Sequence, residues 1–366
     1  MRPRTGRSHP PIDSRALLMM KAFRRHARRE RAASLVEVPV PVPGKNQVLL
    51  KVSHCGICGS DLHAWLNHPG YESVLPEVTF GHELSGSVVS TGPDAGDWKE
   101  GDRAVMIALQ ASHDPNDRYC AEGLPQLSPR RRVQGLHLDG GMAEYVCVEQ
   151  EFLLPIPDGL DLPLAALTEP LSVAEHCIGN RSSVGPGDRV VVSGPGIIGM
   201  FCALSARSRG AEVILTGTEQ DETTRLSAAR TIGFETLLVG HGHPPLHEQI
   251  TAYFPDGADA LVEASGSAHA LADSWQSVRP DGVVTAVALY SRTIDFDLTQ
   301  FLRKQIDLRT SYASSRPDYL RAFDLLSQGA VDLAALTRTY PLAQAGQAFA
   351  DSENLQVMKA LLACSD

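Results

Sequence analysis

The sequence lacks several features that would each indicate a particular class of protein. No apolar run approaches the roughly 20 residues that a membrane-spanning helix needs. The chain also does not open with the basic and then apolar pattern of a secretory signal peptide. Positive charge is not in excess, because 43 acidic residues outnumber 33 Lys and Arg and give a formal net charge of -10. We therefore expect no membrane association and no general binding of nucleic acid.

The cysteines do not form the pattern of a disulfide framework. There are seven of them, an odd number, scattered from Cys55 to Cys364. Such usage is typical of a reducing compartment. We therefore expect a cytoplasmic protein in which a cysteine with a function binds a metal or reacts.

The N-terminal segment departs from the acidic balance. The first 31 residues hold ten Lys and Arg but only Asp13 and Glu30 as acids. Such a segment could be a flexible arm for nucleic acid or an acidic partner, or an Arg-rich organelle transit sequence. Three prolines within it disfavour an amphipathic helix. We favour a third interpretation, in which residues 1–19 are a disordered basic extension before a natural start at Met20.

The length of the chain and its succession of predicted strands and helices predict two domains. The chain has 366 residues, against roughly 150 per domain. Up to about residue 155, short apolar strands such as 48–52, 85–90 and 103–108 are cut by Gly and Pro, which predicts a β-rich, barrel-like domain. After about residue 160, strands alternate with helices, which predicts an α/β domain with a doubly wound parallel sheet.

A glycine-rich loop lies between a predicted buried strand, 188–193, and a predicted helix, 198–209. It reads Gly194-Pro195-Gly196-Ile197-Ile198-Gly199. In this pattern the glycines allow a tight turn, close approach of a pyrophosphate and close contact between helix and strand. The helix N-terminus adds free N–H groups and a positive dipole end. We predict a dinucleotide site here.

The residues after the next predicted strand, 212–216, bear on the choice of nicotinamide cofactor. An NAD site usually has an acidic residue at that strand end, for the ribose 2′-hydroxyl, but this chain has Gly217. Acidic residues follow, beginning with Glu219, and Arg225 lies just beyond. Arg225 could pair with a 2′-phosphate, whereas the acids would repel it. We favour NAD and leave NADP open.

Two short segments contain the residue types of a catalytic zinc site. Cys58, His82 and Glu83 together supply a thiolate, an imidazole and a carboxylate. Asp61 could orient the imidazole from behind. Cys55 and Cys58 also form a C-x-x-C pair, which leaves a redox pair or a structural zinc open as less favoured alternatives. We interpret Cys55 as a small buried residue.

In this order, these motifs resemble the zinc-dependent medium-chain dehydrogenase/reductase family, in particular its polyol and butanediol dehydrogenase branches. The resemblance covers nearly the whole chain from about Met20. Its motifs are Gly56–His63, Gly81-His82-Glu83, Gly140–Tyr145, Glu169-Pro170-Leu171-Ser172-Val173, the Gly194–Gly199 loop, Glu263-Ala264-Ser265-Gly266 and Val278–Gly282.

The resemblance implies roles for individual residues. Cys58, His82 and Glu83 would bind one catalytic zinc, and Glu169 would bind the metal or its water. Ser60 and His63 would occupy the proton-relay positions. The cofactor would lie against the glycine-rich loop and further residues, namely Gly194, Gly196, Ile197, Ile198, Gly199, Gly217, Glu219, Arg225 and Gly266.

The resemblance also implies an architecture. A GroES-like β-barrel catalytic domain would comprise residues 20–170 and 306–366, with a Rossmann dinucleotide-binding domain over 171–305. Members of this family commonly form dimers or tetramers, so we expect a homodimer or homotetramer.

The chain departs from the family pattern in the lobe that usually holds a second, structural zinc on four cysteines. Alignment on Cys120 and Gly123 places Asp114, Asp117 and Ser128 at the other three ligand positions. One thiolate cannot make a four-cysteine site, so we predict that the structural zinc is absent. An unusual metal site with His113 is a less favoured alternative. A second departure, Ala64 where the sorbitol branch typically has Tyr, leaves the particular polyol open.

The resulting hypothesis is an enzyme that transfers a hydride between a secondary alcohol, such as a polyol or diol, and NAD(P). One alternative is a zinc-free quinone or enone reductase of the same fold. Another is a non-catalytic protein that binds NAD(P)H or, through the basic arm, nucleic acid. The complete set of catalytic residue types favours the first.

Overall fold

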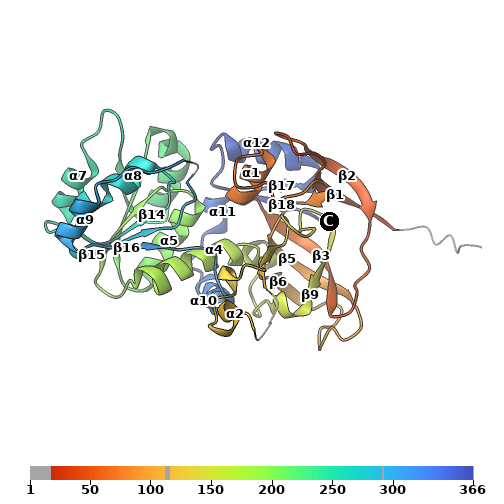
Figure 1. The fold of residues 1–366 in the computed structure, drawn as a ribbon. Coiled ribbons are helices and arrows are strands. Elements are labelled where there is room, and N and C mark those ends of the chain that lie inside the picture. The colour runs from red at the N-terminus through yellow and green to blue at the C-terminus, as the bar shows by residue number, and fades with distance from the viewer. Residues whose placement is uncertain (1–17, 112–115, 291, 366) are drawn as a thin grey trace, which may run out of the picture.

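The computed structural model describes residues 18–111, 116–290 and 292–365, which form two lobes side by side (Figure 1). Nearly all of the predicted basic extension, and Asp114 and His113 of the lobe discussed above, fall outside these ranges. Within them, no helix is both long and apolar enough to span a bilayer.

The β-rich lobe is built around a seven-stranded sheet. Its strands are β3 (Gln47–Gly56), β5 (Glu83–Thr91), β6 (Arg103–Met106), β9 (Tyr145–Glu149), β10 (Leu153–Pro155), β17 (Thr337–Pro341) and β18 (Lys359–Ala363). The order is β10-β6-β5-β3-β18-β17, and β9 also pairs with β3. The last strand of the chain, β18, therefore pairs antiparallel with β3 near the beginning of the chain.

Smaller elements complete this lobe. A three-stranded sheet contains β1 (Met19–Arg25), β2 (Ala33–Pro39) and β4 (Val78–Thr79), and a two-stranded sheet contains β7 (Leu109–Gln110) and β8 (Arg132–Val133). The short helices are α1 (Gly59–Trp65), α2 (Arg118–Ala121), α3 (Leu162–Ala165), α11 (Leu333–Leu336) and α12 (Ala345–Glu353).

The second lobe contains a six-stranded sheet in which every pair of neighbouring strands is parallel. Its order is β13-β12-β11-β14-β15-β16. The strands are β11 (Arg189–Ser193), β12 (Glu212–Gly217), β13 (Glu235–Leu238), β14 (Ala258–Glu263), β15 (Val278–Ala286) and β16 (Asp307–Thr310). The chain runs outward from β11 to one edge and then returns to β14, so the strand order reverses between β11 and β14. Ligands bind at such a reversal, beyond the carboxyl ends of the strands.

Helices cover both faces of this sheet. They are α5 (Ile197–Ser208), α6 (Ser227–Thr231), α7 (Leu246–Tyr253), α8 (Ala268–Asp273) and α9 (Leu298–Lys304). Side chains alternate along a strand, so Val190 and Val192 belong to the core that includes α5 and α6. Val191 belongs to a separate core with residues of α7, α8 and α9. The predicted fold class, a Rossmann sheet combined with a β-rich domain, is confirmed.

Two helical segments join the lobes. Helix α4 (Thr168–Glu175) continues as a π-helix over His176–Ser182 and leads to β11, and α10 (Arg316–Ser327) leads back and packs on α4. Strand β16 pairs with β15, so the Rossmann sheet extends past residue 305, where the sequence places the end of that domain. The sequence boundary is early because 307–310 contains the charged Asp307 and Arg309, which mask an edge strand.

Candidate metal centre and cofactor cleft

Cys58, His82 and Glu83 are brought together at the inner end of the β-rich lobe. Their ligand atoms, Sγ, an imidazole nitrogen and a carboxylate oxygen, all lie within 4.8 Å of one another. His82 and Glu83 are buried and Cys58 is partly exposed. No other such group of three metal-ligating residue types is found within the described ranges.

The strand register explains this meeting. Gly56, the last residue of β3, pairs directly with Glu83, the first residue of β5. Cys58 follows two residues later and caps the N-terminus of α1. Position 56 must be glycine for this approach, because a Cβ there would lie 2.0 Å from Glu83 Oε2.

Asp61 faces the imidazole of His82. Its Oδ2 accepts a hydrogen bond from the Cys58 amide at 3.0 Å, and its Oδ1 lies 3.6 Å from His82 Nδ1. Burial raises the pKa of Asp61, and the neighbouring His82 acts in the opposite direction. A carboxylate facing Nδ1 favours a proton on that nitrogen, which leaves the Nε2 lone pair available to a metal.

The sequence did not predict the role of Lys359. This residue on β18 is buried, forms an ion pair with Glu83 Oε2, and donates to the carbonyl of Ile57 at 2.8 Å. Burial alone would lower the pKa of Lys359, but the negative charges of Glu83 and Cys58 raise it overall. In the sequence, the position of Lys359 is unusual because it is a charged residue at the start of an otherwise apolar strand.

Glu169, at the start of α4, approaches the cluster without joining the group of three. Its burial raises its pKa to about 7, against the influence of His82, and the negative charge of Glu83 adds to the rise.

The donor set fits a zinc ion. Thiolate, imidazole and carboxylate are the zinc ligands found in proteins, and burial would strengthen their attraction for a cation. The cluster with Asp61 and Glu169 contains four acidic groups, counting the thiol, against two groups that can carry positive charge, Lys359 and His82. A buried divalent cation would offset this excess of potential negative charge.

The two predicted relay residues have different hydrogen-bond partners in the structure. Ser60 Oγ lies 3.3 Å from His82 Nε2, at the metal cluster. His63, one turn further along α1, instead contacts His68 and lines the cleft.

A cavity of about 1150 Å³ runs between the lobes beside this cluster. On one side it is lined by Ile57, Gly59 and His63, which flank Cys58 and continue along α1. On the other side it is lined by the glycine-rich loop and by the ends of β11 and β12, including the predicted cofactor residues Gly194, Gly196, Ile197, Ile198, Gly217 and Arg225. Gly199, Glu219 and Gly266 are not among its lining residues.

The glycines of the loop have distinct roles. Gly194 has a φ of 99°, and a Cβ there would lie 2.6 Å from the Ser265 backbone. A Cβ at Gly199 would lie 1.9 Å from the carbonyl oxygen of Gly194, so this glycine permits close packing of helix and strand. A Cβ at Gly196 would meet no atom within 4 Å. This open space at the N-terminus of α5 fits a pyrophosphate.

Steric crowding explains the missing carboxylate at the end of β12. A Cβ at Gly217 would lie 2.8 Å from Pro195 Cγ. Asp221 lies nearby and accepts hydrogen bonds from the Thr218 amide and hydroxyl through Oδ2. Its Oδ1 accepts from Arg225 Nη1 at 3.1 Å.

The segment around α2, which aligns with the family's structural-zinc site, is held together by hydrogen bonds. Asp117 accepts from the hydroxyl of Ser128 at 2.6 Å and from the amides of Tyr119 and Cys120. These hydrogen bonds, led by that of Ser128, lower the pKa of Asp117. Two of the aligned ligand positions, 117 and 128, are therefore bonded directly to each other.

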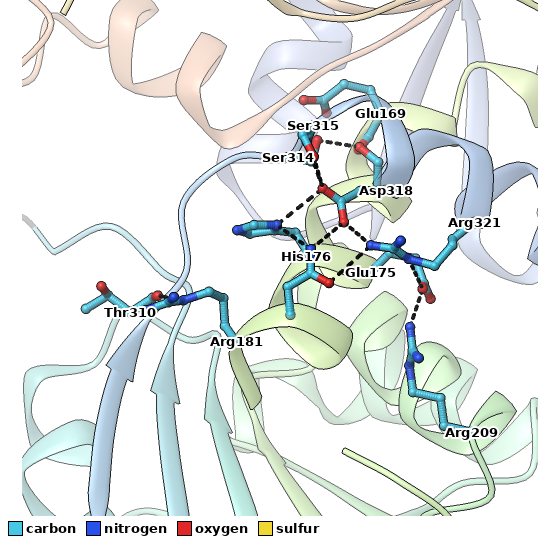
Figure 2. Close-up of polar contacts among 12 residues, drawn as sticks. Glu169, Glu175, His176, Arg181, Arg209, Thr310, Ser314, Ser315, Asp318 and Arg321 are labelled. Atoms are coloured by element: carbon cyan, nitrogen blue, oxygen red, sulfur yellow. Dashed lines mark hydrogen bonds and ion pairs between the residues drawn. The ribbon is translucent and has the colours of Figure 1, made fainter. Parts of the chain in front are cut away.

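A buried polar network lies below Glu169, where α4 meets α10 (Figure 2). Asp318 contacts His176 Nδ1 at 3.2 Å and Arg321. Arg209 donates to Glu175 at 2.6 Å. The network ties both connections between the lobes to α5.

Comparisons with known proteins agree with this architecture. The pattern of the alcohol dehydrogenase GroES-like domain matches residues 44–158, and that of the zinc-binding dehydrogenase family matches residues 198–328. The chain is 33% identical over 329 residues to a sorbitol dehydrogenase of Halalkalibacterium halodurans, covering 89% of this chain and 94% of that protein. It is 31% identical to a D-arabitol-phosphate dehydrogenase of Enterococcus avium, covering 86% and 89%.

Solved structures are similar over the same extent. The 2R,3R-butanediol dehydrogenase of Bacillus subtilis superposes with a TM-score of 0.85 at 25% identity, covering 94% of this chain and all of that chain. A putative zinc-binding dehydrogenase from Sinorhizobium meliloti, bound to NADP, has a TM-score of 0.85 at 28% identity, covering 94% and 99%. The chain therefore belongs to the zinc-dependent medium-chain dehydrogenase/reductase family, within its polyol dehydrogenase group.

Proposed function

We propose that this enzyme reversibly oxidises a secondary alcohol of a polyol, diol or related small hydroxyl compound, with zinc and a nicotinamide cofactor. The observation that carries the proposal is the Cys58–His82–Glu83 cluster beside the cleft that contains the glycine-rich loop. Relatives named for sorbitol, D-arabitol phosphate and butanediol support the substrate class. The metal-ligating cluster also argues against the zinc-free reductase alternative.

The chain's own residues would prepare the alcohol for reaction. Cys58, His82 and Glu83 would hold a zinc ion, which as a Lewis acid makes a hydroxyl easier to deprotonate. Asp61 would orient His82, and substrate and cofactor bound in the cleft would limit water around the reacting groups. Ser60 would accept the hydroxyl proton, and His63 would carry it onward from the cleft.

The second lobe would position the cofactor, whose nicotinamide ring supplies the hydride acceptor. The loop Gly194–Gly199 would bind the pyrophosphate with the N–H groups of α5. Fixing both reactants on opposite walls of one cleft would align the two carbon atoms and lower the entropic part of the barrier.

We propose NAD rather than NADP as the cofactor. Arg225, the residue placed to attract a 2′-phosphate, is already paired with Asp221 at 3.1 Å. Glu219, two residues before Asp221, adds an exposed acid that pairs with His243 of the cleft wall. Initial rates with both cofactors at equal concentration would test this, and a higher kcat/KM with NADP would contradict it.

We also infer a homodimer or homotetramer in a reducing, cytoplasmic compartment. None of the seven cysteines, all of which lie within the described residues, forms a disulfide. Strand β16 leaves one edge of the six-stranded sheet open, and a second copy could pair there.

Metal analysis combined with a substrate screen tests the function. The purified enzyme should contain one zinc per chain and reduce NAD with at least one polyol or diol. Cys58→Ser should lose zinc and turnover together, whereas Cys147→Ser, a matched change on β9, should keep both. An active Cys58→Ser enzyme without metal would rule out the proposal.

A further inference from the structure

A second histidine lies directly against His63. The Nδ1 atoms of His63 and His68 are 2.8 Å apart, and their ring centroids are 5.0 Å apart. At this distance one nitrogen must donate and the other accept, so the two rings share one proton. His63 lines the cleft, whereas His68 is exposed to solvent. The pair therefore joins the cleft to bulk water.

The backbone and a buried arginine fix the position of His68. Asn67 adopts a left-handed conformation with a φ of 55°, and the His68 amide then donates to the His63 carbonyl at 3.0 Å. Asn67 Oδ1 accepts a hydrogen bond of 2.6 Å from Arg25, which is only 2% exposed. Arg25 also donates to the carbonyl of Val74 at 3.1 Å, which holds the loop from its other side.

The surroundings of His63 hold its ring in place and favour its neutral form. Its ring stacks on Tyr71 with centroids 5.5 Å apart and planes 18° apart, so its orientation is fixed. The groups that face it are Tyr71 and His68, since Asp61 is turned toward the metal cluster. Burial, followed by repulsion from His68, lowers the pKa of His63, which favours the neutral ring.

We propose that His68 is the outer member of a two-histidine path that carries the proton of alcohol oxidation from the cleft to solvent. This proposal rests on the proposed function. In the resting pair, Nδ1–H of His63 donates to Nδ1 of His68, and His68 holds its own proton on Nε2. When His63 accepts a proton on Nε2, its Nδ1 proton passes to His68, and His68 releases its Nε2 proton to water.

One proton thus enters the pair and one leaves it. Both rings end neutral but in the opposite tautomers. Carbonyl reduction runs the same path in reverse and restores the original tautomers, as does proton exchange with water during repeated oxidation. Because no electron is transferred in the path, it requires no further reactant.

The test compares His68→Ala with His26→Ala, an exposed histidine of the same lobe, in the zinc-loaded enzyme. We expect His68→Ala to lower kcat for polyol oxidation at pH 7 about tenfold or more, with zinc content and NAD affinity unchanged. Free imidazole in the buffer should restore much of this loss, and the kcat profile should move to higher pH. His26→Ala should match the wild type. A loss that imidazole does not restore, with an unchanged pH profile, would show a merely structural role.

A measurement without substrate separates this proposal from the proposed function. In ¹⁵N NMR titrations of histidine-labelled enzyme, His68→Ala should raise the pKa of His63, because the repulsion between the rings is gone. If the pKa of His63 were the same in the wild type and in His68→Ala, the proposed path would be overturned. If the wild type oxidises no polyol or diol, both the proposed function and this path are ruled out. If the wild type is active and the His68→Ala variant is equally active, the path is overturned and the proposed function stands.

Discussion

At the level of individual residues, the buried positive charge of Lys359 pairs with Glu83 of the metal cluster. Its side chain is held between Glu83 and the Ile57 carbonyl, away from water. An ion pair of this kind is costly to break from one side, because the remaining charge stays buried without a partner. The stability of the metal-free protein should therefore depend on this lysine.

Replacement of Lys359 tests that dependence. Lys359→Met should lower the free energy of unfolding of the metal-free protein by about 3–5 kcal/mol, the range for a buried pair that loses one partner. Urea unfolding provides the measurement. The double variant Lys359→Met/Glu83→Gln should recover part of the loss, because no charge is then left unpaired. Equal losses in the single and double variants would contradict the expectation.

Ser60 offers a second prediction at this scale. Ser60→Ala should retain zinc and bind NAD, but its kcat for alcohol oxidation should fall about 100-fold or more, as for removal of a general base. Steady-state rates at pH 7, with metal content measured on the same sample, provide the test. A normal rate at neutral pH would exclude Ser60 from proton transfer.

The candidate site could be predicted where its residues lie close together in the sequence. The Gly56–His63 and Gly81–Glu83 motifs name the residues that the structure brings together, although their role as ligands remains a prediction. Lys359 could not be predicted in this way, because it contacts Ile57 across 302 positions of the chain. The contact between His63 and His68 also escaped prediction, since it depends on the left-handed conformation of Asn67.

At the level of secondary-structure elements, the junction of α4 and α10 is held by Asp318. Although burial opposes it, hydrogen bonds from His176 and Ser315 hold the pKa of Asp318 below its usual value. A carboxyl group whose pKa is lowered by folding stabilises the protein above its unfolded pKa of about 3.9. That contribution is lost as the pH falls through the folded-state pKa.

Asp318→Asn should therefore destabilise the protein in a pH-dependent way. The expected loss at pH 7 is about 1.5–3 kcal/mol, the range for a hydrogen bond to a charged group. This loss should shrink steadily below pH 4 in urea unfolding measurements. Asp324→Asn, an exposed change on the same helix, should have little effect. A difference that stays constant from pH 7 to pH 3 would contradict this reasoning.

The lobe around α2 should depend on its hydrogen bonds rather than on a structural zinc. Ser128→Ala removes the hydroxyl that donates to Asp117, so this lobe should become more susceptible to limited proteolysis. Treatment of the wild type with a chelator should not reproduce that susceptibility. Cleavage of the chelated wild type in this lobe would instead indicate a metal there.

The elements themselves were largely predictable. The strand and helix around the glycine-rich loop, expected at 188–193 and 198–209, are observed as β11 (Arg189–Ser193) and α5 (Ile197–Ser208), because buried valines and a helix periodicity flank the glycines. The sequence also indicates a strand over 282–288, but β15 begins earlier, at Val278. The first residues of β15 are irregular, with Pro280 and a positive φ at Asp281, so they do not show the pattern of a strand.

At the level of the whole molecule, one edge of the Rossmann sheet is open beside apolar side chains. Strand β16 is the outermost strand, and its residue Leu308 is exposed. Leu298 and Leu302 of α9 are also exposed, Leu302 to 71%. Exposed apolar side chains gathered near an unpaired strand are typical of a subunit interface.

Leu302→Glu should weaken that interface. Light scattering after size exclusion should show a dimer or tetramer for the wild type and a smaller species for the variant at micromolar concentration. Leu320→Glu, an equally drastic change at an exposed position of α10, should keep the wild-type mass. A monomeric wild type would contradict the expected assembly.

The pairing of β18 with β3 has a consequence for how the protein is made. The N-terminal lobe emerges first from the ribosome, but its central sheet stays incomplete until β18 (Lys359–Ala363) has been translated. The Rossmann segment, by contrast, is complete by residue 310. Since domains fold as units during synthesis, we expect the inserted domain to mature first on the nascent chain. The zinc pocket should close only after β18 has left the ribosome.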